Sequence, residues 1–404
     1  MIPTIERFGA LMLTCAIVAM LARRAKLPYT IALLFSGIAL AFVPFMPEIP
    51  LTKELIFSVL LPPLIFEAAL FLPWKELRKV LPVVAAMASV GLLMAAVVTA
   101  LGMHYLVGWP PLAAGIFGVL IAATDPVSVI ATFKEAGVHG RLRILVEAES
   151  LFNDGSAAVM FGLVLAVASG PAPSVASVAG SAVLTVGGGI LCGAGVASVL
   201  VFLAGRTEDH LVELTFTVVA AYSSFILAEH FGLSGVLATL TAGLIFGDHE
   251  RHGAITEKGR IAVESFWEFS AFVANSLVFI LIGMHEARQE FGTILIPSIV
   301  AIVVVLLGRI LAIYPTCLLF RWSRQNVSIQ HQHALVWGGL RGALALALAL
   351  GLPDSMPMRG QIVTVSFAVV AFSIVVQGLT MTPFLRWQRL LSSDTTNHSH
   401  TDRP

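Results

Sequence analysis

"ATDPVS", residues 123–128, interrupts an apolar run that extends from residue 111 to residue 133. Pro126 has no backbone N–H and clashes with the preceding turn, so the carbonyl of Ala122 loses its helical hydrogen-bond partner. Two half-helices that meet at such a break expose free N–H groups and free carbonyls. The stretch therefore predicts an interrupted helix inside a membrane.

The composition around this break is that of a membrane protein. Of 404 residues, 57% are hydrophobic and only 12% are charged, against about 25% charged in a soluble domain. The mean hydropathy is +0.91. Net charge is zero without a basic or acidic tract, so no nucleic-acid partner is expected. Cys15, Cys192 and Cys317 lie in apolar segments without C-x-x-C spacing, which argues against a disulfide framework or a thiolate metal site.

The apolar runs predict an all-α polytopic membrane protein with about thirteen spans, since a spanning helix needs roughly 20 apolar residues. The predicted spans are 8–22, 28–46, 54–72, 80–107, 111–133, 144–169, 174–204, 211–229, 233–247, 263–284, 292–320, 332–351 and 361–385. Residues 1–385 then form a single membrane domain. Residues 386–404 are polar and are expected to be a short disordered cytoplasmic tail.

The loop charges test this count of spans. Loops after odd-numbered spans, together with the C-terminus, hold 18 of the 24 Lys and Arg residues, and the opposite side holds four. The remaining two, Arg309 and Arg341, lie inside spans. Positive loops face the cytoplasm, so the sorting predicts a multi-pass protein of the cell (inner) membrane. Its N-terminus is expected outside and its C-terminus in the cytoplasm.

Thirteen spans can be divided into six, one linker and six, and the two sets of six then run in opposite directions, as an inverted repeat requires. The fifth span of the second set, 332–351, contains "WGGLRGA" with three glycines around Arg341. Each interrupted span is thus the fifth span of its repeat. A carboxylate offsets positive helix ends and an arginine offsets negative ones, which suits Asp125 and Arg341. A purely structural role for either residue stays open.

A second polar cluster, "ESLFNDG" (149–155), lies in the apolar span 144–169. At 3.6 residues per turn, Ser150 and Asp154 share one helix face, and Glu149 and Asn153 share the adjacent face. Hydroxyl, amide and carboxylate oxygens are ligands that hard cations such as Na+ prefer. The alternative for Ser150 and Asn153 is hydrogen bonding between helices.

Four further features need an explanation. Thr124 can offer its hydroxyl and an unpaired carbonyl to an ion, and Glu67 is either a further ion ligand or a carboxylate satisfied by helix packing. Arg309 should have an acidic partner, because an unpaired guanidinium in a membrane is very costly; Glu149 is the candidate. "GDHERHG" (247–253) is expected to be a solvated cytoplasmic turn, with pH sensing or metal binding as the alternative.

"FEAAL" (66–70), "TDPV" (124–127), "ESLFNDG" and "GGLRGALALAL" (338–348) occur together in an order that resembles the monovalent cation:proton antiporter family. The resemblance is to NhaP-type Na+/H+ antiporters, which are related to the animal Na+/H+ exchangers. It implies an NhaA-like antiporter fold with two interrupted, crossing helices, a role in sodium transport and pH homeostasis, and a homodimer.

By this resemblance, each protomer has core helices at about 80–169 and 292–385 and dimerisation helices at about 8–72 and 211–284.

The resemblance also assigns residues. Asp154 matches the essential carboxylate that binds either the cation or the proton, and Asp125 acts beside it. Ser150, Thr124 and Glu67 match residues that line the cation site, with Na+ held at Asp154, Ser150 and Thr124.

Asn153 adds a polar group to the expected cation site, and its pairing with Asp154 resembles the electroneutral branch of the family. Glu149 matches an acid that pairs with an arginine, here Arg309. Arg341 is expected to compensate a helix end.

The function implied is exchange of Na+ (or Li+) for H+ by alternating access, with cation and proton competing for Asp154. An unpaired carboxylate in the membrane is easier to protonate than one in water. No enzymatic activity and no cofactor are expected, and K+/H+ exchange by the same fold stays open. An intramembrane aspartyl protease using Asp125 and Asp154 is disfavoured, because Asp125 precedes a proline and no G-x-G-D occurs. A channel is disfavoured by the paired interruptions.

Overall fold

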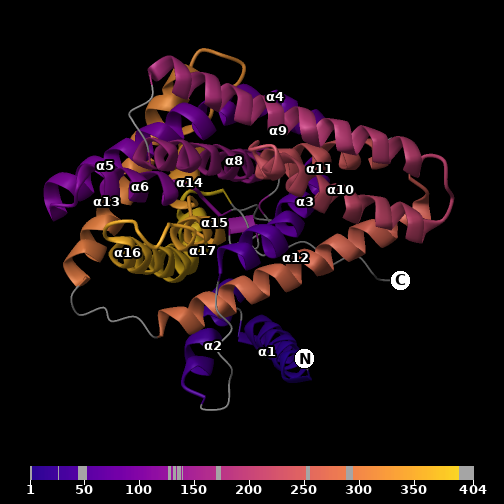
Figure 1. The fold of residues 1–404 in the computed structure, drawn as a ribbon, viewed down its shortest axis with the longest axis horizontal. Helices are drawn as coiled ribbons and strands as arrows, with labels where there is room; N and C mark the ends of the chain where they lie inside the picture. The colour runs from indigo at the N-terminus through magenta and orange to yellow at the C-terminus, as the bar shows by residue number, and fades with distance from the viewer. Residues whose placement is uncertain are drawn as a thin grey trace, which may run out of the picture.

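The computed structural model describes residues 2–25, 27–43, 52–125, 129, 130, 133, 138, 140–169, 174–251, 255–287 and 294–390. Within these ranges the chain is helical and contains no strand (Figure 1). In chain order the α-helices are α1 (Ile2–Ala25), α2 (Tyr29–Ala41), α3 (Leu61–Phe71), α4 (Trp74–Ala86), α5 (Leu92–Val107), α6 (Pro111–Leu120), α8 (Arg141–Ser169), α9 (Val175–Ala204), α10 (His210–His230), α11 (Gly235–Arg251), α12 (Glu257–Glu286), α13 (Leu295–Leu319), α14 (Ile329–Trp337), α15 (Ala343–Leu350), α16 (Arg359–Phe372) and α17 (Gly378–Trp387). Three π-helical segments join some of them: η1 (Leu55–Leu60), η2 (Met87–Gly91) and η4 (Ser373–Gln377).

Within the described residues, each of the thirteen predicted spans contains one helix or a series of joined helices, and the all-helical membrane fold is confirmed. Seven stretches of the described chain are long and apolar enough to cross a membrane. The shorter apolar helices include α2, α6 and the η1–α3 stretch. The predicted tail begins at residue 386, whereas α17 continues to Trp387. Residues 391–404 lie outside the described residues.

Both expected interruptions are present. α6 ends at Leu120, and residues 123–125 are not helical. Pro126, on which the prediction of this break rested, lies outside the described residues. The second interruption separates α14 from α15, which leaves Gly338–Gly342 as the link between two half-helices. Proline and clustered glycines both disfavour a continuous helix, so the sequence carries a local reason for each break.

The helices pack in two groups. α12 lies along α2, and α11 packs against α9, α3 and α10. In the other group α13 packs against α5, α5 against α6, and α15 against α16. Figure 1 shows α5, α6 and α13 on the left, α10 and α11 on the right, and α12 running beneath both. α8 contacts members of both groups, including α4, α6, α9 and α11.

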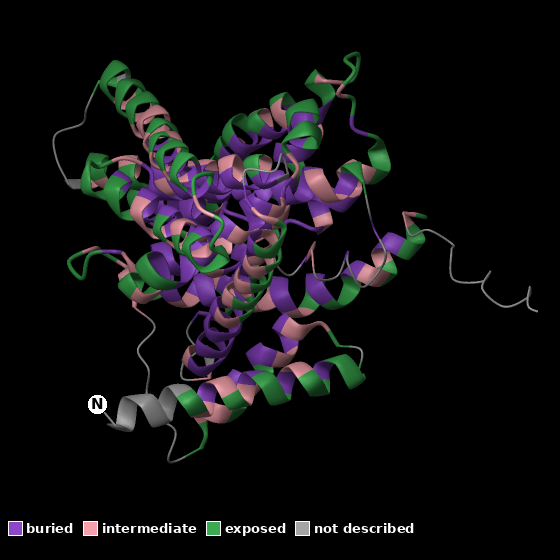
Figure 2. Cartoon of the chain, turned by 90° about the vertical axis from the view of Figure 1, so that its right-hand side faces the viewer, coloured by how far each residue is buried: buried purple, intermediate pink, exposed green. Residues whose placement is uncertain are grey.

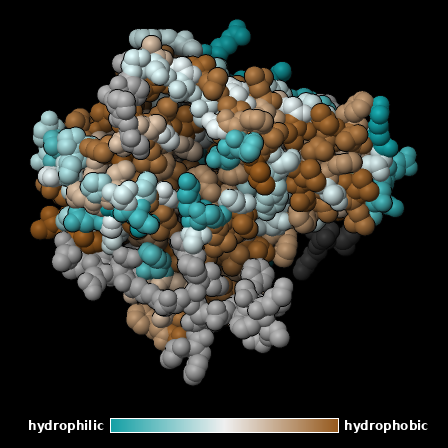
Figure 3. Space-filling model, viewed as in Figure 1, coloured by the Kyte–Doolittle hydropathy of each residue, from teal (hydrophilic) through white to brown (hydrophobic). Residues whose placement is uncertain are grey.

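Burial follows this packing. Figure 2 shows buried residues along the middle of the molecule and exposed ones on the outer faces of the peripheral helices. Many of the exposed side chains are large and apolar, such as Leu184 and Leu191 of α9 and Ile296 and Leu319 of α13. Figure 3 shows the hydrophobic surface that results over much of one face. Such a surface is stable in lipid, where apolar side chains need no burial inside the protein.

The expected turn at 247–253 is wrong for its first five residues, because α11 continues through them to Arg251. The reason is packing against α3. Gly247 has no side chain, and a Cβ there would overlap the backbone carbonyl of Leu70. His249 is exposed, and its Nδ1 lies 2.9 Å from the carbonyl oxygen of Ile245 one turn earlier. Residues 252–254 lie outside the described residues.

Candidate ion-binding site

The two interruptions meet at Asp125. Its backbone N–H donates a hydrogen bond of 2.7 Å to the carbonyl of Leu340, in the link between α14 and α15. Its side chain lies against Gly342, which precedes α15. A Cβ on Gly342 would overlap the Asp125 Cβ and come within 3.0 Å of Oδ2. The carboxylate therefore sits at the N-terminal end of α15, where the helix dipole stabilises a negative charge.

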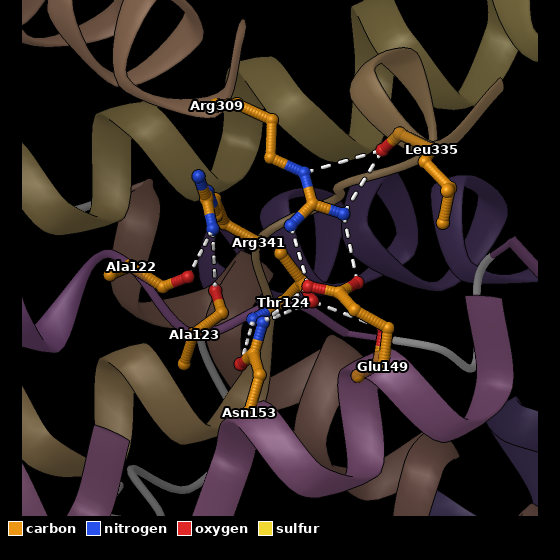
Figure 4. Close-up of polar contacts among 9 residues, drawn as sticks. Ala122, Ala123, Thr124, Glu149, Asn153, Arg309, Leu335 and Arg341 are labelled. Atoms are coloured by element: carbon orange, nitrogen blue, oxygen red, sulfur yellow. Dashed lines mark hydrogen bonds and ion pairs between the residues drawn. The ribbon is translucent and has the colours of Figure 1, made fainter. Parts of the chain in front are cut away.

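Arg341 satisfies the opposite kind of helix end. Its Nη1 donates to the carbonyls of Ala122 at 2.6 Å and of Ala123 at 3.0 Å, just beyond the C-terminus of α6 (Figure 4). Ala122 is the residue whose carbonyl the break deprives of a helical partner. A buried guanidinium in hydrogen-bond contact with free carbonyls compensates the negative end of a half-helix. This geometry matches the compensating role expected for Arg341.

Thr124 is held by two residues of α8. Its backbone N–H donates to Asn153 Oδ1 at 3.1 Å, and its Oγ1 accepts from Asn153 Nδ2 at 2.8 Å. The hydroxyls of Thr124 and Ser150 are 3.0 Å apart. Thus residues from the two adjacent faces of α8 converge on a single residue of the first interruption. Asn153 satisfies a backbone group that the break leaves free.

Glu149 and Arg309 form the ion pair that the charge argument predicts. Arg309 donates from Nη1 to Glu149 Oε1 at 2.6 Å and from Nη2 to Oε2 at 2.8 Å. Both residues are buried. Arg309 Nε and Nη2 also donate to the carbonyl of Leu335 in α14, at 3.2 and 3.0 Å. Asn153 Nδ2 donates to Glu149 Oε1 at 3.1 Å, which links the pair to Thr124.

Asp154 faces a small cavity of about 30 Å³ beside the crossing. This volume suffices for a water molecule. Leucine and isoleucine side chains of α3 form one wall, and the two interruptions form the other. The lining residues are Leu61, Leu64, Ile65, Ala123, Thr124, Asp125, Leu151, Asp154, Gly342, Ala343, Leu344 and Ala345. Asp154 is only 8% exposed, and within the described part of the chain it forms no hydrogen bond or ion pair.

The predicted cation ligands divide into two sets. Asp154, Thr124 and Asp125 line the cavity, whereas Ser150 lies behind Thr124, in contact with its hydroxyl. Glu67 is half-buried and is not among the lining residues. It lies three residues after Leu64 on α3, which displaces it by about 4.5 Å along the helix axis. A ligand role for Glu67 therefore stays a prediction.

The sequence reasoning missed two polar residues that contact the second interruption. Ser373 accepts a hydrogen bond of 2.9 Å from the backbone N–H of Arg341. Gln377 donates one of 3.0 Å to the carbonyl of Trp337. The available signal was a pair of polar residues four apart in the otherwise apolar stretch "SIVVQ", a spacing that puts both on one side of a helix.

Gly342→Ala is expected to destabilise the protein by about 1–3 kcal/mol, the usual cost of overpacking a tight contact. The added methyl group would overlap Asp125 and force the two interruptions apart. Thermal unfolding in detergent measures the effect. Gly115→Ala in α6 is the matched control, because no atom lies within 4 Å of its added Cβ. Equal unfolding temperatures for the two variants would contradict a tight crossing at Gly342.

Comparisons with known proteins agree with this architecture. The profile of the family described as "Sodium/hydrogen exchanger, transmembrane" matches residues 9–387. The Na(+)/H(+) antiporter ApNhaP of Aphanothece halophytica is 38% identical over 361 residues, which cover 88% of this chain and 68% of the relative. The Na(+)/H(+) antiporter NhaP of Pseudomonas aeruginosa is 34% identical over 345 residues, covering 83% of this chain and 81% of the relative.

A solved structure extends the agreement to the fold. The sodium proton antiporter MjNhaP1 from Methanocaldococcus jannaschii superposes with a TM-score of 0.78 at 20% identity. The match covers 97% of this chain and 99% of the other. At this identity the match concerns the fold alone, and it shows that the chain has the overall fold of a solved antiporter.

Proposed function

This chain belongs to the sodium/hydrogen exchanger family, and we propose that it exchanges Na+ (or Li+) for H+ across the cell membrane. The observation that carries the proposal is the buried carboxylate of Asp154 on the wall of the cavity where the two interrupted helices cross. The relatives named above are Na+/H+ antiporters, and this supports the choice of ions. The activity needs no covalent chemistry and no cofactor.

Competition of Na+ and H+ for Asp154 would couple the transport of the two ions. The carboxylate of Asp154 on the wall of this cavity can be neutralised by a proton or by a monovalent cation, and whichever binds removes the negative charge that attracts the other. The Thr124 hydroxyl and Asp125 would supply further oxygen atoms to the cation, since oxygen ligands replace the hydration shell of a hard ion. Ser150 would act through Thr124, to which it is hydrogen-bonded.

Exchange also requires that the site changes its accessibility from one side of the membrane to the other when Asp154 is neutralised. The empty site, in which Asp154 is charged, must not make this change. The two helix groups suit alternating access, in which one bundle moves against the other around a fixed site. The core would be α4–α8 and α13–α17, and the other group would form the dimerisation surface. Apolar side chains on α9, which belongs to this other group, are exposed in the single chain, and lipid or a second copy would cover them.

The proposed orientation has the N-terminus outside and the C-terminus in the cytoplasm, because positively charged loops face the cytoplasm. With this orientation the exchange that a proton gradient drives is Na+ out for H+ in. The K+/H+ alternative gains no support from the named relatives, all of which are Na+/H+ antiporters.

The test of the proposal is proton flux in vesicles that contain the purified protein, with Na+, Li+ or K+ added in turn. We expect Na+ and Li+ to dissipate an imposed pH gradient and K+ to have little effect. Choline chloride at equal concentration is the control for ionic strength. A response to K+ alone would replace the proposed substrate by potassium, and no response to any of the three cations would refute the proposed exchange.

Exchange is expected to be electroneutral, because one titrating carboxylate beside the uncharged Asn153 serves one monovalent cation. Asn153 is hydrogen-bonded to Thr124 and Glu149 and carries no proton of its own to the exchange. The rate of Na+-driven proton flux, measured in vesicles with the membrane potential clamped at several values, should stay constant. A transport current, or a rate that rises with applied voltage, would count against one-for-one exchange.

A further inference from the structure

The last helical stretch, α16–η4–α17, carries two buried polar residues that the proposed exchange does not use. Ser373 is 1% exposed and Gln377 is 3% exposed. They are the first and last residues of the π-helical segment η4. Ser373 Oγ donates to Gln377 Oε1 at 2.7 Å, so the two side chains act as one hydrogen-bonded unit. Short π-helical segments inside α-helices are frequent at functional sites.

Both ends of this unit reach the second interruption. The N–H of Arg341 donates to Ser373 Oγ at 2.9 Å, and Gln377 Nε2 donates to the carbonyl of Trp337 at 3.0 Å. Trp337 ends α14, and Arg341 lies in the link before α15. In a membrane, free backbone groups of an unwound segment are tolerated only where protein or water satisfies them. Ser373 and Gln377 satisfy one such group on each side of the link.

There is little room for water beside the Gln377 side chain. The small cavity beside Gln377 has a volume of about 10 Å³ and is also bordered by Arg309, Gly339 and Arg341 together with apolar residues. A single water molecule needs at least about 10–15 Å³ of such space. An apolar side chain at position 377 would therefore leave the Trp337 carbonyl without a partner. The backbone of the link would then relax into another conformation.

The position of the link matters because the site is built on it. Arg341 reaches from the link to the carbonyls of Ala122 and Ala123, which directly precede Thr124. The neighbouring carbonyl of Leu340 accepts the hydrogen bond from Asp125. Any shift of residues 338–342 is passed to Thr124 and Asp125, two of the three polar residues on the cavity wall.

We propose that Ser373 and Gln377 are positioning residues for cation binding: they hold the unwound link between α14 and α15, and through Arg341 and Leu340 they set the geometry of the cavity at Asp154. Neither residue contacts the cavity itself. The proposal rests on the proposed cation/proton exchange for its kinetic consequence, and its structural part stands independently of that exchange.

The kinetic test compares Ser373→Ala and Gln377→Leu with Ser366→Ala in vesicles. Ser366 is the matched control: it is buried in α16, and its hydroxyl donates only to Ile362 one turn earlier in its own helix. We expect the two test variants to raise the apparent KM for Na+ by about three- to tenfold, with a smaller change in kcat. This is the change in a binding constant that corresponds to the loss of one buried hydrogen bond. Ser366→Ala should stay within about twofold of wild type.

Two further variants separate positioning from general destabilisation. Ser373→Thr keeps the hydroxyl and should retain a nearly wild-type KM. The double variant Ser373→Ala/Gln377→Leu should raise KM about as much as the stronger single change, because the two residues form one hydrogen-bonded unit. Multiplied effects in the double variant, or an equal rise of KM in Ser366→Ala, would overturn the proposal.

A measurement that does not depend on transport tests the structural part of the proposal. Hydrogen–deuterium exchange of the peptide that spans residues 338–343 should become faster in Ser373→Ala, which loses the acceptor for the Arg341 N–H, and stay unchanged in Ser366→Ala. If wild type shows no cation-driven flux, the proposed function fails while this measurement still tests the link. Unchanged hydrogen–deuterium exchange of this peptide together with an unchanged KM for Na+ would overturn the positioning role. If Ser373→Ala does not fold, Gln377→Leu carries both measurements.

Discussion

Asp154→Asn is expected to reduce Na+-driven proton flux to the background of protein-free vesicles while the protein still folds and inserts. Asp154 is the carboxylate that faces the cavity without a hydrogen bond or ion pair in the described part of the chain. Asparagine has nearly the same size and causes no overpacking, but it neither titrates nor carries the negative charge that attracts a cation. The proteins are compared in vesicles with an imposed pH gradient at equal amounts of inserted protein.

The control for this experiment is Asp154→Glu, which keeps the carboxylate and displaces it by one methylene group. It should retain measurable flux with a changed apparent affinity for Na+. Thermal unfolding of each purified variant checks that lost flux does not reflect lost folding. Wild-type flux in a correctly inserted Asp154→Asn protein would remove Asp154 from the mechanism.

Arg309→Ala and Glu149→Ala are each expected to lower stability by about 3–5 kcal/mol, because each leaves one buried charge without its partner. The pair is bidentate, with N–O distances of 2.6 and 2.8 Å, and both residues are buried. The double variant leaves no lone charge, so it should lose less stability than the two single losses combined. Unfolding temperatures of the four proteins in one detergent give the comparison.

An exposed ion pair of the same chain serves as control. Lys79 Nζ lies 3.0 Å from Glu76 Oε1, with both side chains largely exposed. Lys79→Ala should cost at most about 1 kcal/mol, since exposed ion pairs contribute little. Simple additivity of the Arg309→Ala and Glu149→Ala losses would show that these residues do not act as a pair.

Much of the architecture was predictable because the membrane imposes strong constraints. Membrane spans need long apolar runs, and positively charged loops lie on one side of the membrane. The thirteen spans could therefore be predicted without knowledge of any contact between helices. The breaks were predictable from Pro126 and from the glycines around Arg341. The partner of Arg309 was predictable because a buried charge requires an opposite one, and few acids occur inside the spans.

The details of the site were not predictable from helix periodicity. Spacing tells which residues share a face of α8, but not which other element that face meets. Helix periodicity placed Asn153 near the expected cation site, but it did not predict that Asn153 bridges Thr124 and Glu149. Ser373 and Gln377 are uncharged. The cost of burying an unpaired charge, which predicted the partner of Arg309, therefore gave no reason to select them. The helical course of residues 247–251 depends on contact between Gly247 and α3, which is a tertiary effect.

If Na+ and H+ compete for Asp154, binding of the cation must release the proton, and this release can be measured without transport. Purified protein in weakly buffered detergent solution, near the midpoint of its transport activity in pH, is mixed with NaCl while a pH-sensitive dye reports free protons. Wild type should release up to about one proton per bound Na+, choline chloride should release none, and Asp154→Asn should release none with either salt. Proton release of wild-type size from Asp154→Asn would contradict competition at this carboxylate.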